Sequence, residues 1–163
     1  MTCTIYGDPH YYTYDGDRLD YQGDCRYLAS SYCGNNTDTA NFSVIIKQEY
    51  RPGNIWSERV TFIQYVDVVI DGWTARLLKN GVFEVYGVRA YAPYSFTFND
   101  TDTTVTIEQK SDGSVLVTTS FGLEVWYEGN WHSTVTVKQA TYGGQVCKDL
   151  HRGLSRMPGV GNI

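Results

Sequence analysis

Apolar and polar residues alternate with a period of two along several stretches of this chain. In the segment 104–109, Val105 and Ile107 fall on one face and polar residues fall on the other. The same alternation occurs in 42–50 and in 132–139. A period of two is typical of half-buried β-strands, because successive side chains of a strand point to opposite faces. The pattern therefore favours strands over helices throughout.

Turn signals separate these alternating stretches. Asp-Gly or Asn-Gly pairs stand at 15–16, 71–72, 80–81 and 112–113. Such pairs favour tight hairpins, because both residues tolerate a positive φ. We therefore predict an all-β fold, an antiparallel β-sandwich of roughly 10–13 short strands.

The end of the chain differs from the rest. The segment 148–163 is basic, rich in glycine and without alternation. The 163 residues suffice for one domain with a substantial hydrophobic core. We therefore predict one domain over 1–147 and an irregular tail over 148–163.

The charge of the chain argues against nucleic acid as a partner, and its hydropathy argues against a membrane span. The net charge is −5 and basic residues form no run, whereas nucleic-acid binding needs clustered Lys and Arg. No stretch approaches the roughly 18 apolar residues of a membrane span. The first residues lack the apolar region of a signal peptide, which leaves two interpretations, a cytosolic protein or a piece of a longer secreted chain.

Two features favour the piece of a secreted chain. Asn35, Asn41 and Asn99 each begin an N-glycosylation sequon. The spacing of the cysteines suits disulfides rather than a zinc site, and these cysteines are Cys3, Cys25, Cys33 and Cys147.

The segment 3–33 carries the most specific pattern. Between Cys3 and Cys33 it holds Gly-Asp-Pro-His-Tyr at 7–11, Thr-Tyr-Asp-Gly at 13–16 and Gly-Asp-Cys-Arg-Tyr at 23–27. This pattern closely resembles the opening of a von Willebrand factor type D domain. The strand at 42–50, the hairpin at 121–137 and the run Tyr-Gly-Gly-Gln-Val-Cys at 142–147 extend the resemblance over 3–147.

The resemblance implies a non-catalytic, extracellular structural or adhesive module of a larger mucin-like or matrix glycoprotein. Its partners would be neighbouring domains of the same chain and other secreted glycoproteins, assembled through disulfides. An alternative within the family is a type D module of a large lipid-transfer or vitellogenin-like lipoprotein. Sequence on either side of 1–163 would discriminate between the two.

The resemblance also implies a disulfide between Cys33 and Cys147. Closing so long a loop contributes about 4–5 kcal/mol in the chain-entropy model. The family continues after Cys147 with a second cysteine, but Leu150 stands at that position here. The usual partners of Cys3 and Cys25 are missing, so these thiols pair with each other, pair with another chain or stay reduced.

Calcium is the one cofactor that the family suggests. In the family, the aspartate of the Asp-Gly turn joins oxygen ligands from the loop after the last cysteines. Asp15 stands at that position, but the loop ligands are not recognisable here. Calcium needs six to eight oxygens, so a solvated acidic turn is the favoured interpretation, with calcium as the alternative.

The Asp8-Pro9 bond is a candidate for self-cleavage, because some family members with Gly-Asp-Pro-His break their own chain there. The Asp8 carboxylate can attack its own main-chain carbonyl to form a cyclic anhydride. His10 could protonate the leaving nitrogen of Pro9 in a mildly acidic compartment. The simpler alternative is a turn before a strand, with His10 as an ordinary strand residue.

Other catalytic or sugar-binding interpretations are weaker. A hydrolase needs a base beside a nucleophile, and neither His132 nor His151 lies in such a motif. The tryptophans could line a sugar-binding face, but such residues are more often core or cross-strand partners. They are Trp56, Trp73, Trp126 and Trp131.

Overall fold

The computed structural model describes residues 2–32, 40–50, 60–99, 102–130 and 135–139. These residues form fourteen β-strands and one short 3₁₀ turn, Lys79–Gly81. Every strand pairing is antiparallel. The predicted all-β sandwich is therefore confirmed, with one strand more than the upper end of the predicted number. The predicted tail over 148–163 lies outside the described residues.

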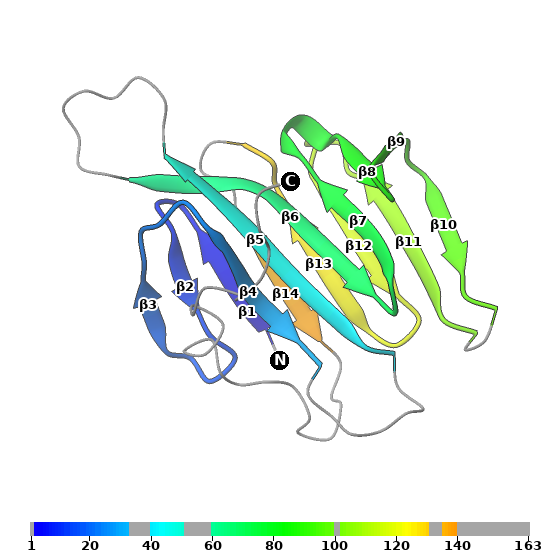
Figure 1. Ribbon diagram of the computed structural model, residues 1–163, viewed down its shortest axis with the longest axis horizontal. Helices are drawn as coiled ribbons and strands as arrows, with labels where there is room; N and C mark the ends of the chain where they lie inside the picture. The colour runs from blue at the N-terminus through cyan, green and yellow to red at the C-terminus, as the bar shows by residue number, and fades with distance from the viewer. Residues whose placement is uncertain (1, 33–39, 51–59, 100–101, 131–134, 140–163) are drawn as a thin grey trace.

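The strands form two sheets, which Figure 1 shows as two layers lying one over the other. The larger sheet has eight strands in the order β10-β11-β12-β13-β14-β1-β2-β3. Their bounds are β10 Tyr94–Thr97, β11 Thr104–Gln109, β12 Val115–Thr119, β13 Leu123–Tyr127, β14 Val135–Gln139, β1 Thr2–Tyr6, β2 His10–Tyr12 and β3 Arg18–Asp20.

The smaller sheet is a six-stranded meander in which each strand pairs with the next along the chain. Its strands are β4 Arg26–Ser31, β5 Phe42–Tyr50, β6 Thr61–Ile70, β7 Trp73–Leu77, β8 Phe83–Val85 and β9 Val88–Ala90. The turn between β6 and β7 has positive φ at both Asp71 and Gly72, 43° and 85°. The predicted Asp-Gly hairpin signal is correct at this position.

The first strand, β1, holds the larger sheet together. It pairs with β2 on one side and with β14 on the other. Cys3 and Ile5 on β1 are fully buried. The N-terminal three strands and the C-terminal five strands of the sheet thus meet at β1.

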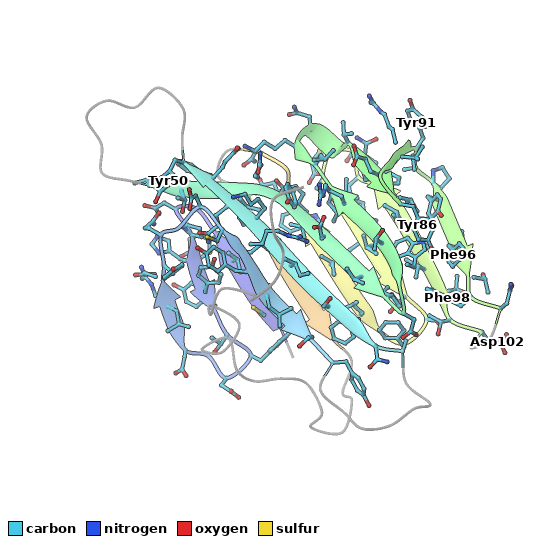
Figure 2. The ribbon with its side chains drawn as sticks, viewed as in Figure 1. Tyr50, Tyr86, Tyr91, Phe96, Phe98 and Asp102 are labelled. Atoms are coloured by element: carbon cyan, nitrogen blue, oxygen red, sulfur yellow. The ribbon has the colours of Figure 1, made fainter. Side chains whose placement is uncertain are left out.

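The core fills the space between the two sheets. Val105 and Ile107 are fully buried on β11, as the alternation predicts. Phe42, Val44 and Ile46 are likewise buried on β5. At the outer edge, Phe96 and Phe98 make an edge-to-face pair with centroids 4.9 Å apart, and Figure 2 places both beside β10.

Candidate functional site

The connection between β1 and β2 holds the Asp8-Pro9 bond. Gly7 precedes it with a φ of +68°, a conformation that favours glycine. A Cβ at Gly7 would meet nothing closer than 3.7 Å, so the backbone conformation, not crowding, calls for glycine. Pro9 is buried, whereas the Asp8 side chain is 47 % exposed. The Asp8 carboxylate therefore lies at the surface, whereas the proline on the other side of the peptide bond is buried.

His10 lies between two carboxylates. Its Nε2 is 3.0 Å from Asp8 Oδ1, and its Nδ1 is 2.7 Å from Asp20 Oδ1. The imidazolium form can donate to both carboxylates at once, whereas either neutral tautomer can donate to only one. The contact at Nε2 holds the Asp8 side chain next to its own peptide bond, while Nδ1 also lies 3.2 Å from the donor Arg18 Nη2.

Asp20 is fixed opposite His10 by the pairing of β2 and β3, in which these two residues are direct partners. Arg18 donates to both of its oxygens, from Nε at 3.0 Å and from Nη2 at 3.1 Å. The hydrogen bonds from Arg18 and from His10 lower the pKa of Asp20 below its ordinary value. Asp20 thus stays ionised in mildly acidic solution, where it continues to orient the imidazole.

Gln22 also contacts the Asp8-Pro9 peptide bond. Its Nε2 donates to the main-chain oxygen of Asp8 at 2.6 Å. Its Oε1 accepts from the main-chain N–H of Thr61 at 2.7 Å and from the Thr61 hydroxyl at 3.0 Å. Thr61 begins β6 of the smaller sheet, so Gln22 connects the Asp8 carbonyl to the opposite layer of the sandwich.

The tyrosines of this segment divide between the core and the surface. Tyr11 is buried, and its hydroxyl accepts a hydrogen bond from Nε2 of buried Gln48. Tyr6 and Tyr12 stack outside the core, with centroids 5.6 Å apart and planes 9° from parallel. Tyr6 also meets the ring of His10 edge-on at 5.4 Å. The tyrosines of this segment therefore pack within the local sheet and against one side of the His10 ring.

Asp15 lies exposed in the turn between β2 and β3. The turn closes on its own backbone, through bonds from Thr13 N–H to the Asp17 oxygen and from Gly16 N–H to the Thr13 oxygen. No group of three or more His, Cys, Asp or Glu that could hold a metal ion occurs among the described residues. The loop after Cys147, from which the family draws its other ligands, lies outside the described residues.

The cysteines differ in accessibility. Cys3 is fully buried with a free thiol, and burial raises its pKa to about 12. Cys25 also has a free thiol but is only half-buried. Within the described residues, these two thiols are therefore not bonded to each other. Cys33 and Cys147, the pair implied by the family resemblance, lie outside the described residues.

Two of the three sequon asparagines lie at the surface. Asn41 is exposed just before β5, and its main-chain N–H donates to the Asp71 carboxylate at 3.0 Å. Asn99 is exposed after β10. Asn35 lies outside the described residues. Asn41 and Asn99 are thus both placed where a glycan could attach without disturbing the core.

The remaining aromatic candidates do not form a binding face in the described structure. Trp73 is fully buried in the core. Trp126 is half-buried and donates from Nε1 to Ser114 Oγ at 2.8 Å. Trp56, Trp131, His132 and His151 lie outside the described residues. Both described tryptophans are thus accounted for by packing and hydrogen bonding.

Exposed apolar side chains gather at one edge of the smaller sheet. Tyr86, Val88 and Tyr91 are 59 %, 70 % and 73 % exposed, and they flank or belong to the edge strand β9. Figure 2 shows Tyr91 at the upper right of the molecule. The guanidinium of Arg89 lies over the Tyr91 ring, 5.4 Å from its centroid. An exposed group of this kind is typical of a contact surface.

Comparison with known proteins places the fold in a family. The model of the von Willebrand factor type D domain matches residues 3–147, which is most of the chain. The chain therefore belongs to the von Willebrand factor type D domain family, as the motif at 3–33 indicated. The sandwich, the Gly-Asp-Pro-His segment and the β13–β14 hairpin all fall within the match.

Several curated relatives are similar over most of the chain. The IgGFc-binding protein of Homo sapiens is 35 % identical over 151 residues, covering 90 % of this chain and 3 % of that protein. Zonadhesin of Sus scrofa is 34 % identical over 146 residues, covering 90 % and 5 %. Mucin-5B of Gallus gallus is 47 % identical over 87 residues, covering 52 % and 4 %. The chain thus spans a small fraction of each relative, and none of these three names is that of an enzyme.

The described residues include no helix long and apolar enough to cross a membrane.

The motif at 7–11 indicated Asp8, Pro9 and His10 but not the residues that surround them. Asp20 could have been found, because the Asp15-Gly16 turn folds 18–20 back onto 10–12 and sets the two residues opposite each other. Gln22 carried no comparable signal. Its contact with Asp8 depends on Thr61, which is 39 residues away in the sequence.

Proposed function

We propose that this chain is a structural and adhesive module of a large secreted glycoprotein and contributes to its disulfide-linked assembly. The observation that carries the proposal is the match of 3–147 to a family whose members here include a mucin and zonadhesin. A sandwich with a filled core and half-buried Cys25 supports a linking role rather than a catalytic one. The surface positions of Asn41 and Asn99 suit N-glycosylation in the secretory pathway.

Cys25, rather than Cys3, is the thiol available for a bond to another chain. Exchange requires an accessible thiolate, and Cys3 is fully buried with a raised pKa. Expression of the chain with its neighbouring sequence in secreting cells tests this. We expect disulfide-linked multimers on non-reducing gels, lost in Cys25→Ser and retained in Cys3→Ser. Secreted wild-type protein that is monomeric without reductant would contradict the assembly role.

We further propose that the chain cleaves itself between Asp8 and Pro9. The Asp8 carboxylate attacks the carbonyl carbon of its own residue and forms a cyclic anhydride. The bond to the Pro9 nitrogen breaks as this nitrogen takes a proton from the His10 imidazolium. Water then opens the anhydride to leave the two carboxyl groups of Asp8 and a free N-terminal proline. The contact of His10 with Asp8 at 3.0 Å supports this proposal.

Mass spectrometry of the purified protein under denaturing conditions tests the cleavage. Incubation at mildly acidic pH, where an ordinary imidazole is protonated, should convert the chain into fragments that end at Asp8 and begin at Pro9. Asp8→Ala removes the nucleophile and should stay intact under the same conditions. Equal amounts of intact chain in both proteins would sink the proposal.

A further inference from the structure

We infer that Gln22 is a catalytic residue of this cleavage, because its side-chain amide binds the oxygen on which negative charge develops. This inference rests on the self-cleavage proposed above. The main-chain oxygen of Asp8 belongs to the peptide bond that would break, and Gln22 Nε2 donates to it at 2.6 Å. The contact is therefore made to a reacting atom.

The orientation of the Gln22 amide follows from its other partners. A main-chain N–H can only donate, so the Gln22 atom 2.7 Å from the Thr61 nitrogen must be the acceptor Oε1. The remaining end of the amide is then the NH₂ group, which faces the Asp8 oxygen. The assignment of this donor thus depends on hydrogen-bond chemistry and not on the choice between two similar atoms.

Thr61 fixes the far end of Gln22 within the sandwich. Thr61 is fully buried, and its hydroxyl lies 3.0 Å from Gln22 Oε1 and 3.3 Å from Gln48 Oε1. Gln48 in turn donates to the hydroxyl of Tyr11. Side chains from both sheets therefore hold the amide in place before any reaction begins, as preorganised catalysis requires.

The chemistry explains why a donor at this position accelerates the reaction. Attack by the Asp8 carboxylate turns the planar carbonyl into a tetrahedral centre and places a negative charge on its oxygen. A fixed N–H donor stabilises that charge more than it stabilises the neutral carbonyl. Loss of a water-excluded donor of this kind costs about 10²–10³ in rate. Gln22 is exposed to solvent, which can partly substitute, so we expect a smaller loss.

The test compares cleavage rates of wild type and Gln22→Met, which keeps the length of the side chain but has no donor. We expect a fall of roughly 10- to 100-fold at mildly acidic pH. Gln109→Met is the matched control, because Gln109 is exposed on β11, near the opposite end of the larger sheet. It should cleave at the wild-type rate.

The outcomes separate this inference from the cleavage itself. If wild type cleaves and Gln22→Met cleaves equally fast, Gln22 has no role and the proposed cleavage stands. If neither wild type nor Asp8→Ala cleaves, the proposed cleavage fails and the role of Gln22 fails with it. Thermal unfolding of each variant shows whether the substitution has disturbed the fold.

Gln22→Glu provides a second readout and decides the matter if Gln22→Met does not fold. An ionised carboxylate faces the Asp8 oxygen with an acceptor, whereas the protonated acid regains a donor. Its rate relative to wild type at the same pH should therefore rise as the pH falls through about 4.3. The wild-type rate measured at each pH is the reference for this comparison. A ratio that does not change with pH would overturn the inference.

Discussion

At the scale of single residues, Asp67 shows how this sheet tolerates charge on its outer face. Its carboxylate accepts hydrogen bonds from Arg26 Nη2 at 2.7 Å and from Arg76 Nε at 2.7 Å. The Asp67 side chain is only 9 % exposed, so its charge depends on these two partners. The hydrogen bonds that Arg76 donates to Asp67 raise the pKa of Arg76. Three strands, β4, β6 and β7, are thereby linked by one carboxylate.

Asp67→Asn should lower the free energy of unfolding by roughly 1–3 kcal/mol, because it leaves two guanidinium groups without their counter-charge. Urea unfolding monitored by fluorescence measures this loss. Glu108→Gln is the matched comparison, because Glu108 meets Lys110 at a similar distance, 2.6 Å, but is 57 % exposed. That variant should change stability by less than about 0.5 kcal/mol. Equal effects of the two substitutions would contradict the importance of burial here.

At the scale of elements, a bulge in β6 sets the direction of Thr61. The register between β5 and β6 shifts between Lys47 and Gln48, so that Gln48 pairs with Ile63 while Lys47 pairs with Tyr65. The alternation of β6 changes phase across this shift. Thr61 and Ile63 then face the core together with Val66. Without the bulge, Thr61 would point outward, away from Gln48.

The position of β1 determines what cleavage would do to the molecule. Cleavage after Asp8 would cut the chain between β1 and β2, yet β1 is hydrogen-bonded on both sides and buries Cys3 and Ile5. We therefore expect the cleaved β1 segment to stay in the sheet. Size-exclusion chromatography of cleaved protein should give one peak containing both fragments, and only denaturant should separate them.

Ile5→Ala provides the control for that experiment. Removal of a fully buried isoleucine side chain costs about 2–5 kcal/mol, so the cleaved variant should lose the β1 segment more readily than cleaved wild type. Release of the segment from cleaved wild type in native buffer would contradict retention by the sheet.

At the scale of the whole molecule, a buried thiol and buried tyrosine hydroxyls should make the fold less stable at alkaline pH. Burial raises the pKa of Cys3 to about 12 and also raises the pKa values of Tyr11 and Tyr14. Each folded pKa then lies above the unfolded one, so the unfolded chain releases its protons first. The associated stability is present below about pH 9 and is lost as the pH rises toward 12.

Ionisation of the Cys3 thiol in the unfolded chain should by itself lower the free energy of unfolding by roughly 2 kcal/mol between about pH 7.5 and about pH 10.5. Urea unfolding at the two pH values measures this change. Cys3→Ala has no thiol to ionise and should show a smaller decrease over the same interval. A stability that is equal at both pH values in wild type would show that burial does not hold these groups protonated.

Much of the architecture could be predicted from the chain because each strand carries its own pattern. Val105 and Ile107 are buried in alternation, and the Asp71-Gly72 turn is where the hairpin signal placed it. The alternation was less informative at Ile45. This residue lies on the face of β5 opposite to Val44 and Ile46, yet it is buried as they are. Register shifts such as the β6 bulge left no local signal of comparable strength.

The sequence by itself determined the fold class, the family and the candidate bond, because period-two alternation, turn residues and the motif at 7–16 are local features. Only the tertiary structure decided what surrounds that bond. Strand pairing placed Asp20 on His10, and the bulge in β6 turned Thr61 inward, where it holds Gln22 against the Asp8 carbonyl. These contacts join residues of two sheets, and their geometry follows from how the sheets pack and register, which no single segment specifies.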